Sequence, residues 1–241
     1  MNIFDIHSHL LPNVDDGAKN LEISLQMAKQ AVDNRITKMV VTPHFSFKYN
    51  YLDDLIALKK VYCDFKEQLD NNGIPLTIYF GLEILYSEEL LDYLKDKKIE
   101  GINDTDYLLI EFEFDVSGEE IISALAKIKA YGYNPIIAHP ERYFAIWHNF
   151  EILECLVSEN IYCQCNSASL MGYFGRHAKK TMEMMLNCGF VTFIASDCHD
   201  LEVRNLEVFE IYHYIVNRYG VKHADDLFYR NALKFFLRGA N

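Results

Sequence analysis

Histidines and carboxylates recur in this sequence at the ends of short apolar runs. His7 and His9 follow the first run, and Asp197 and His199 follow the last. Side chains of an extended segment alternate between two faces, so both histidines of a His-x-His pair can reach one ion. Imidazole and carboxylate donors without thiolates suit Mn²⁺, Fe or Zn²⁺, and carboxylates can bridge two ions. The runs between them supply further candidate ligands: His44, Glu83, Glu111 and His139.

Each of these patterns is weak evidence alone, because a single histidine at a strand end commonly packs or caps. Their convergence is stronger evidence, since burying several unpaired charges together is costly. Asp16 is the preferred ligand of the Asp15-Asp16 pair, while Asp15 could instead ligate or cap the turn before Gly17. Asp5 could orient a ligand imidazole. The other histidines fall in helical or flanking segments and are interpreted as ordinary residues: His148, His177, His213 and His223.

Alternating strands and helices must position these side chains. The hydrophobic pattern predicts seven strands, near residues 3–6, 37–42, 76–82, 107–112, 135–138, 161–165 and 191–195. Helices are predicted at 21–34, 121–131, about 202–219 and about 224–238. This alternation favours an α/β fold with a parallel sheet, closed or nearly closed into a barrel, and one domain over residues 1–241. The C-terminal strand ends of such a barrel converge on one face, where an active site forms.

Composition narrows the class of protein. The 241 residues are 50% hydrophobic, which predicts a soluble globular chain. Their formal net charge of −12 argues against binding of nucleic acid through its phosphates. No apolar run approaches the roughly 18 residues of a membrane span, and the N-terminal segment does not resemble a signal peptide. We therefore expect a cytoplasmic protein with reduced cysteines and no membrane insertion.

Two cysteine patterns could be mistaken for functional sites. Cys198 and Arg204 have the Cys-x5-Arg spacing of cysteine-dependent phosphatases. Asp200 and Glu202 within this segment would raise the pKa of the thiol, whereas such a nucleophile needs a lowered one. Cys198 is therefore interpreted as a bystander. Cys163 and Cys165 share one face of a predicted strand and are expected to pack in the core.

The order of the candidate ligands resembles that of the polymerase and histidinol phosphatase (PHP) superfamily: Asp5-x-His7-x-His9, Pro43-His44, Glu83, Glu111, His139-Pro140 and Asp197-x-His199. More narrowly, the sequence resembles the manganese-dependent tyrosine phosphatases of bacterial capsule and exopolysaccharide loci. This resemblance is carried by these segments: 7–12, 14–17, 42–44, 110–112, 138–143 and 196–199. It implies a distorted (β/α)₇ TIM-like barrel, the PHP fold, with a site for three divalent ions. Mn²⁺ is the preferred metal, with Fe, Zn²⁺ or Mg²⁺ as alternatives.

The resemblance also implies a role for each ligand. One ion would be held by His7, His9, Glu83 and Asp197; a second, bridged by Glu83, by Glu111 and His139; and a third by Asp16, His44 and His199. Arg142 and Arg204 match positions that bind the substrate phosphate in the family. The chain departs from the family at Glu113, where a proline is common, and at Cys165, where valine or leucine is usual.

The implied activity is hydrolysis of a phosphomonoester, with the phosphotyrosine tail of a bacterial tyrosine kinase as substrate. A hydroxide between two ions would attack phosphorus in line, and His199 or Asp197 could protonate the leaving oxygen. Aromatic residues could line a slot for the tyrosyl ring or simply pack loops: Phe45, Phe47, Tyr49, Tyr51, Tyr143, Phe144 and Trp147. Two alternatives remain open, a small-molecule phosphatase of the histidinol-phosphatase type and a non-catalytic partner of a polysaccharide-assembly kinase.

Overall fold

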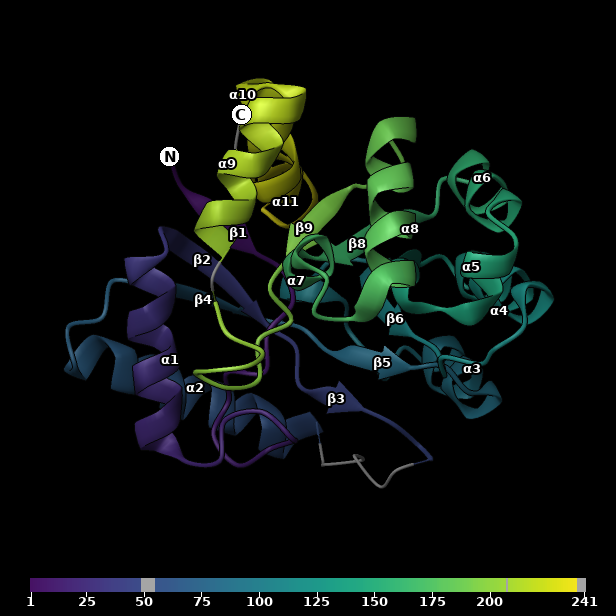
Figure 1. Ribbon diagram of the computed structural model, residues 1–241. Helices are drawn as coiled ribbons and strands as arrows, with labels where there is room; N and C mark the ends of the chain where they lie inside the picture. The colour runs from purple at the N-terminus through teal and green to yellow at the C-terminus, as the bar shows by residue number, and fades with distance from the viewer. Residues whose placement is uncertain (49–54, 207, 238–241) are drawn as a thin grey trace.

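Parallel strands form the centre of the protein in the computed structural model, which describes residues 1–48, 55–206 and 208–237 (Figure 1). One sheet contains β1 (Ile3–Asp5), β2 (Ile36–Val41) and β4 (Thr77–Phe80), in that order. The other has the order β3 (His44–Phe45), β5 (Glu83–Leu85), β6 (Tyr107–Glu111), β7 (Asn134–Ala138), β8 (Tyr162–Asn166) and β9 (Phe193–Ala195). Every pair of neighbouring strands is parallel, as the sequence predicted.

Two predicted strands are each interrupted. The segment expected at 37–42 becomes β2 and, after Pro43, β3; the segment expected at 76–82 becomes β4 and, after Gly81, β5. Proline cannot donate to the ladder, and a side chain at Gly81 would place its Cβ 2.9 Å from Cγ1 of Val40. Seven predicted strands thus become nine among the described residues. Consequently His44 and Glu83 each begin a short strand, whereas the sequence had suggested that they follow strands.

The two sheets meet beyond the ends of the regular strands. Ser8 forms a parallel bridge with Cys198, and the His9 N–H donates to the Cys198 carbonyl at 2.9 Å. On the other side, the Glu83 N–H donates to the Pro43 carbonyl at 3.1 Å. These contacts bring the N-terminal segment against the end of β9 and give the arrangement of a distorted barrel.

Helices cover the outside of the strands (Figure 1). In chain order they are α1 (Leu21–Asp33), α2 (Leu55–Asn71), α3 (Glu88–Lys95), η1 (Ile102–Asp104), α4 (Gly118–Ala130), η2 (Pro140–Arg142), α5 (Phe144–His148), α6 (Glu151–Ser158), α7 (Ser167–Met171), α8 (Gly175–Cys188), α9 (Val208–Tyr219), α10 (Val221–Asp225), η3 (Asp226–Arg230) and α11 (Asn231–Phe236). The α1 helix begins where the Asn20 side chain accepts from the Ile23 N–H, and its buried face includes Met27 and Ala31.

The last two predicted helices have different bounds. Residues 202–206 are not helical, because the Asp200 carboxylate accepts the backbone N–H groups of Glu202, Val203 and Arg204 and folds them into a turn. The segment expected at 224–238 divides into α10, η3 and α11, and residues 207 and 238 lie outside the described residues. No helix among the described residues is both long enough and apolar enough to cross a bilayer.

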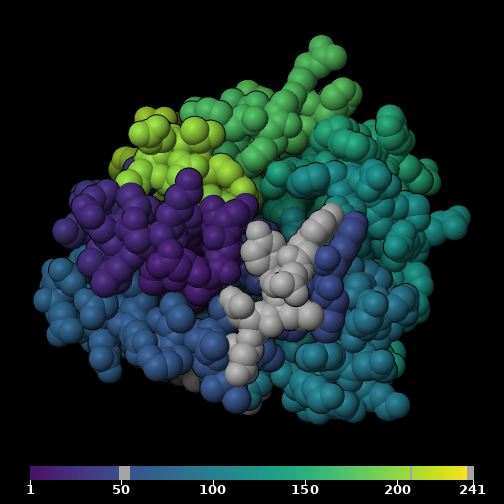
Figure 2. Space-filling view, turned by 90° about the horizontal axis from the view of Figure 1, so that it is seen from below, coloured from purple at the N-terminus to yellow at the C-terminus, as the bar shows by residue number. Residues whose placement is uncertain are grey.

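An apolar cluster fills the space inside the strands at one end. Phe4, Leu109 and Phe193 come from three different strands, and Phe236 of α11 stacks on Phe193 with ring centroids 5.6 Å apart. The N-terminus and α11 lie near this end in Figure 1. Figure 2 shows the opposite face, where the purple N-terminal segment, the yellow-green segment near residue 200 and teal segments of the middle of the chain gather. The polar residues described next lie toward that face.

Candidate active site

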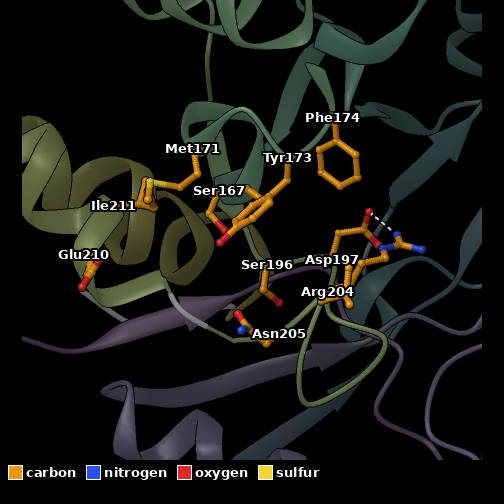
Figure 3. A pocket seen from close by; sticks show the side chains of 12 residues that line it. Ser167, Met171, Tyr173, Phe174, Ser196, Asp197, Arg204, Asn205, Glu210 and Ile211 are labelled. Atoms are coloured by element: carbon orange, nitrogen blue, oxygen red, sulfur yellow. Dashed lines mark hydrogen bonds and ion pairs between the residues drawn. The ribbon is translucent and has the colours of Figure 1, made fainter. Parts of the chain in front are cut away.

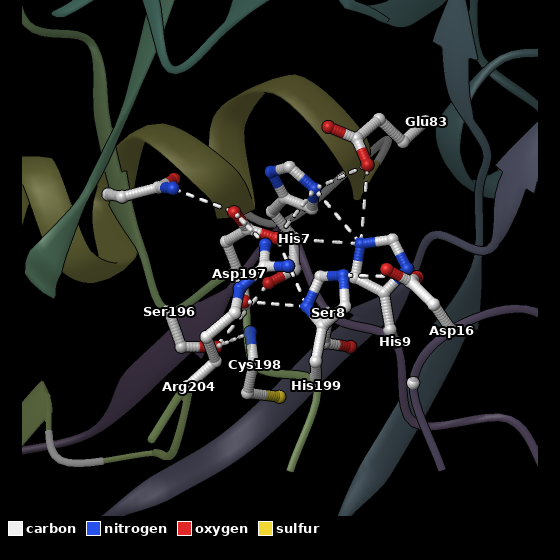
Figure 4. Close-up of polar contacts among 12 residues, drawn as sticks. His7, Ser8, His9, Asp16, Glu83, Ser196, Asp197, Cys198, His199 and Arg204 are labelled. Atoms are coloured by element: carbon white, nitrogen blue, oxygen red, sulfur yellow. Dashed lines mark hydrogen bonds and ion pairs between the residues drawn. The ribbon is translucent and has the colours of Figure 1, made fainter. Parts of the chain in front are cut away.

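Four predicted ligands converge on one point. Nε2 of His7 lies 3.1 Å from Oε2 of Glu83 and 3.4 Å from Oδ1 of Asp197. Nε2 of His9 lies 3.2 and 3.4 Å from the same two oxygens. All four side chains are buried (Figure 4). Two imidazole nitrogens and two carboxylate oxygens from separate parts of the chain therefore surround a common centre.

A chain of hydrogen bonds determines which ring nitrogen of His7 carries the proton. The Asp197 carboxylate can only accept, so Asn166 presents Nδ2 to Oδ2 at 2.7 Å. Asn166 then accepts from Gln164 Nε2 at 2.9 Å, which leaves Gln164 Oε1 facing His7 Nδ1, also at 2.9 Å. When the ring is neutral, Nδ1 of His7 therefore carries the proton and Nε2 directs a lone pair at the centre. Both Gln164 and Asn166 lie at the end of the strand predicted near 161–165, but the sequence analysis gave neither residue a role.

Two further imidazoles are fixed in the same way. Nδ1 of His9 donates to Oδ2 of Asp15 at 2.7 Å, and Nδ1 of His199 donates to the Asp197 carbonyl at 3.0 Å. Carboxylates and carbonyls accept only, so Nε2 of both rings is unprotonated when the rings are neutral. Such contacts behind a ligand set its orientation and tautomer. Asp15 therefore supports His9 from behind and also accepts from the Gly17 N–H.

A second group surrounds Glu83 and Glu111. His139 Nε2 lies 3.0 Å from Oε1 of Glu83 and 3.6 Å from Oε1 of Glu111. His44 Nδ1 lies 3.0 Å from Oε2 of Glu83 and 3.8 Å from Oε2 of Glu111. Glu83 is thus shared between this group and the first one.

The third group lies nearer the surface. Oδ1 of Asp16 is 3.3 Å from Nε2 of His44 and 3.3 Å from Nε2 of His199. His9 belongs to this group as well as to the first. A side chain at Gly17 would clash with the His9 backbone, so glycine allows the loop carrying Asp16 to pack there. All nine predicted ligands are thus brought into one cluster, with His44 and His9 each shared between groups.

The charges in this cluster suit cations. Burial opposes ionisation of Asp197, but His7 and Arg204 outweigh it and hold the pKa of the carboxyl well below its ordinary value. Burial, together with the nearby Glu83 carboxylate, raises the pKa of Glu111 to about 8. Burial likewise lowers the pKa of His139 to about 4. Titratable groups on a solvent-exposed surface keep pKa values close to their ordinary ones, whereas shifts of this kind are common at functional sites.

Two buried oxygens of the first group make the fit to a metal specific. Within the described residues, Oε2 of Glu83 and Oδ1 of Asp197 accept no well-aligned hydrogen bond, although imidazole nitrogens lie 3.0–3.5 Å away. When His7 and His9 are neutral, their Nε2 atoms carry lone pairs and cannot donate to these oxygens. Burial opposes protonation of both imidazoles, but the carboxylates around them outweigh it and raise their pKa, so a bound cation would take the place of any proton held there. Lone pairs facing lone pairs in a buried site are unfavourable unless a cation lies between them. The donor set therefore fits divalent metal ions.

Backbone strain accompanies this geometry. His139 and Asp197 have φ values of 34° and 54°, which non-glycine residues rarely adopt. Asp5 stabilises the same region: its carboxylate accepts from the Ser196 hydroxyl, the Ser196 N–H and the His7 N–H. It does not contact a ligand imidazole, so it orients the backbone instead of a ring.

The two predicted phosphate-binding arginines lie beside Asp197. Arg204 donates from Nη2 to Oδ2 of Asp197 at 2.7 Å (Figures 3 and 4). Nη1 of Arg142 lies 3.5 Å from the same atom. Cys198, the other member of the Cys-x5-Arg pattern, is fully buried, and burial raises the pKa of its thiol to about 12. A buried, protonated thiol is a poor nucleophile.

The predicted aromatic slot is only partly present. Phe45 and Tyr143 are core residues, and the Tyr143 hydroxyl donates to the Ala138 carbonyl. Phe47 packs against Tyr93, with ring centroids 4.8 Å apart. Tyr49 and Tyr51 lie outside the described residues. Phe144 and Trp147 line a pocket, but with Phe114 and Phe174, which the sequence analysis did not single out.

The remaining sequence features lie away from the cluster. Cys163 and Cys165 are buried in β8. Glu113 forms an exposed ion pair with Lys48 at 2.6 Å. The four histidines interpreted as ordinary residues all lie in helices: His148, His177, His213 and His223.

Comparison with known proteins identifies the family. Residues 3–237 match the model of the family described as capsular polysaccharide synthesis, CpsB/CapC. The chain belongs to this CpsB/CapC family. The tyrosine-protein phosphatase YwqE of Bacillus subtilis is 33% identical over 218 residues, which are 90% of this chain and 85% of YwqE. The family resemblance drawn from the sequence is thereby confirmed.

Solved structures agree with the family. One from a study of YwqE from Bacillus subtilis and CpsB from Streptococcus pneumoniae, described as unique metal-dependent tyrosine phosphatases, superposes with a TM-score of 0.88 at 31% identity, covering 97% of this chain and 94% of that one. A histidinol phosphate phosphatase from Lactococcus lactis has a TM-score of 0.60 at 15% identity and covers 92% and 94%. This second likeness concerns the fold alone, and it supports the PHP-like barrel.

Proposed function

We propose that this CpsB/CapC family member is a metal-dependent phosphatase that hydrolyses phosphotyrosine in proteins and thereby regulates capsular or exopolysaccharide biosynthesis. The observation that carries the proposal is the cluster of nine histidine and carboxylate ligands next to two arginines. Its similarity to YwqE and to the metal-dependent tyrosine phosphatase structure supports the choice of substrate.

The proposed centre holds three divalent ions, with Mn²⁺ preferred over Fe, Zn²⁺ or Mg²⁺. His7, His9, Glu83 and Asp197 would hold the first; Glu83, Glu111 and His139 the second; and Asp16, His44 and His199 the third. When bound, such ions lower the pKa of water and offset the negative charge of a phosphate. In this chain, His44 also lies within reach of the second group.

The arginines supply the remaining positive charge of the proposed site. Arg204 is oriented by its hydrogen bond to Asp197, and Arg142 approaches the same carboxylate oxygen. Guanidinium groups bind phosphate oxygens through paired N–H donors, and most strongly in a site sheltered from water. We assign these two residues to binding of the substrate phosphate.

Proton transfer to the leaving oxygen is a less suitable task for Asp197 or His199. Asp197 Oδ2 already accepts from Asn166 and Arg204, and its low pKa keeps it ionised. Nδ1 of His199 donates to a carbonyl, which leaves Nε2 as a ligand atom. A phenolate leaving group needs little help, so the hydrogen bonds favour ligand roles for both residues.

The two alternatives differ from the proposal in specific ways. A histidinol-phosphatase activity would use the same metals on a small substrate. A non-catalytic partner of a kinase would not need to keep mutually repelling carboxylates such as Glu83 and Glu111 together. As expected from the sequence, we propose the phosphotyrosine tail of a bacterial tyrosine kinase as substrate. The cytoplasmic location and the single-domain organisation stay predictions.

The test is hydrolysis of a phosphotyrosine peptide by metal-stripped protein, with and without added Mn²⁺. We expect activity that requires metal, that persists in a Cys198→Ser variant and that prefers the peptide to histidinol phosphate. Activity that survives a chelator and disappears in Cys198→Ser would overturn the metal mechanism. Turnover of histidinol phosphate alone would retain the metals and overturn the choice of substrate.

A further inference from the structure

A pocket lined almost entirely by aromatic rings opens beside Arg142. Its lining residues are Phe114, Arg142, Phe144, Trp147 and Phe174, and its volume is about 170 Å³. None of its four aromatic residues belongs to the ligand cluster. Phe174 also lines the neighbouring pocket drawn in Figure 3, where its ring lies close to the Asp197–Arg204 ion pair.

The guanidinium group of Arg142 forms part of the pocket wall. Its central carbon lies 4.6 Å from the ring centroid of Phe114 and 4.2 Å from that of Phe174. Its Nη1 atom approaches Oδ2 of Asp197 at 3.5 Å. One side chain thus borders both the aromatic pocket and the metal cluster, so an anion bound at the cluster would lie next to the pocket.

The far wall is held in place. The Trp147 indole N–H donates to the Glu141 carbonyl at 2.6 Å, and the Trp147 ring stacks on His177 with centroids 5.2 Å apart. Phe144 packs on Trp147 at 4.8 Å, yet its side chain is 45% exposed. Ligand pockets are lined mainly by hydrophobic and aromatic side chains with a few placed polar or charged groups, and four aromatic residues with Arg142 give this pocket that composition.

The size of the pocket suits a single ring. An apolar cavity of about 150 Å³ accommodates benzene, so this pocket is large enough for a phenyl group. Aromatic pairs gain energy beyond the area that they bury. An alkyl phosphate has no ring to place in the pocket, so it would not gain this interaction energy between aromatic rings.

We propose that this pocket binds the aryl ring of the substrate while Arg142 and Arg204 bind its phosphate, and that the pocket therefore selects aryl over alkyl phosphates. The inference rests on the proposed phosphatase function and adds the residues that recognise the ring. Phe144 and Trp147 contact the ring, whereas Phe114 and Phe174 border it and also hold Arg142.

Phe144→Ala tests the pocket and keeps both rings that pack against the Arg142 guanidinium, Phe114 and Phe174. Tyr173→Ala is the matched control, because Tyr173 is an exposed aromatic residue of the adjoining pocket that does not line this one. The measurement is competitive inhibition of phosphotyrosine peptide hydrolysis, with Mn²⁺ present, by phenylphosphonate and by methylphosphonate. The two inhibitors carry the same anion and differ in the ring.

We expect Phe144→Ala to raise the inhibition constant of phenylphosphonate about 3- to 10-fold, from the worth of one aromatic pair, and to leave that of methylphosphonate unchanged. Tyr173→Ala should change neither. Equal changes for both inhibitors, no change for either, or the same effect in the control would overturn the ring pocket. Absence of metal-dependent hydrolysis in the unmodified protein would instead overturn the proposed function itself.

Discussion

Replacing Gln164 with leucine tests whether the hydrogen bonds behind the ligand cluster control metal binding. Gln164 Oε1 accepts from Nδ1 of His7 at 2.9 Å, and His7 is fully buried. Leucine fills a similar volume but leaves this N–H without its partner, at a cost of about 1–3 kcal/mol that falls on the metal-bound state, because a metal-free ring can move its proton to Nε2 beside Glu83. A tenfold change in an equilibrium constant corresponds to about 1.4 kcal/mol. Residues that hydrogen-bond to a metal ligand typically contribute about 10- to 100-fold to metal affinity. We therefore expect Mn²⁺ affinity to fall about 10- to 100-fold.

The assay is calorimetric titration of metal-stripped protein with Mn²⁺, with hydrolysis measured over the same range of free metal. We expect Gln164→Leu to shift both curves to higher Mn²⁺, with much of kcat recovered at saturation. Asn231→Leu is the control, because Asn231 Nδ2 donates to the Thr192 carbonyl at 2.9 Å, away from the ligands. It should lower stability and leave Mn²⁺ affinity unchanged.

The reasoning fails if folded Gln164→Leu protein binds Mn²⁺ as tightly as the unmodified chain. It also fails if the control weakens Mn²⁺ binding to the same extent, because the effect would then reflect general destabilisation and not the orientation of the His7 ring.

Three further outcomes follow from the same structure. Cys198→Ser should retain nearly all metal-dependent activity, because the thiol is fully buried and burial raises its pKa to about 12; a loss greater than tenfold in folded protein would contradict this. Phe174→Leu removes a cation–π contact with Arg142 worth about 0.5–2 kcal/mol, so inhibition by methylphosphonate should weaken about 2- to 30-fold, and unchanged inhibition would refute the contact's role. In the metal-free protein, burial raises the pKa of Glu111 to about 8, and Glu83 and Asp16 outweigh burial to raise that of His44 to about 10; Mn²⁺ must then displace protons from both groups at pH 7, so affinity should rise as the pH increases through 8. Calorimetry in buffers of different ionisation enthalpy measures that proton release, and pH-independent affinity would count against it.

Much of the site could be predicted because its ligands follow a simple rule. In parallel α/β folds, polar residues past apolar strands meet at one face, and His7, Glu111 and Asp197 obey it. The interruptions at Pro43 and Gly81 were harder to predict, since a single proline or glycine within an apolar run does not say where the ladder resumes. Tertiary packing decides which sheet the short strands β3 and β5 join, so the sequence did not predict their place at one edge of the second sheet.

The aromatic residues show where sequence patterns stop being informative. Tyr143 lies beside a ligand segment, yet its hydroxyl finds a buried carbonyl and the ring enters the core. Phe174 is more than 30 positions from Arg142 in the sequence and reaches it only through the fold. Similarly, nothing in the composition of residues 202–206 distinguishes a helix from the turn that Asp200 caps.

The contact between Ser8 and Cys198 has a consequence for the order of events during folding. This bridge joins the segment after β1 to the segment after β9. The segments bearing His7 and Asp197 can therefore meet only after most of the chain is present. Contacts so distant in sequence form slowly, because the intervening loop must close first. A nascent chain on the ribosome therefore has no complete first ligand group until Asp197 has emerged and β9 has docked. Metal capture would then mark the end of biosynthetic folding, and chains truncated before β9 should emerge unable to hold the ion.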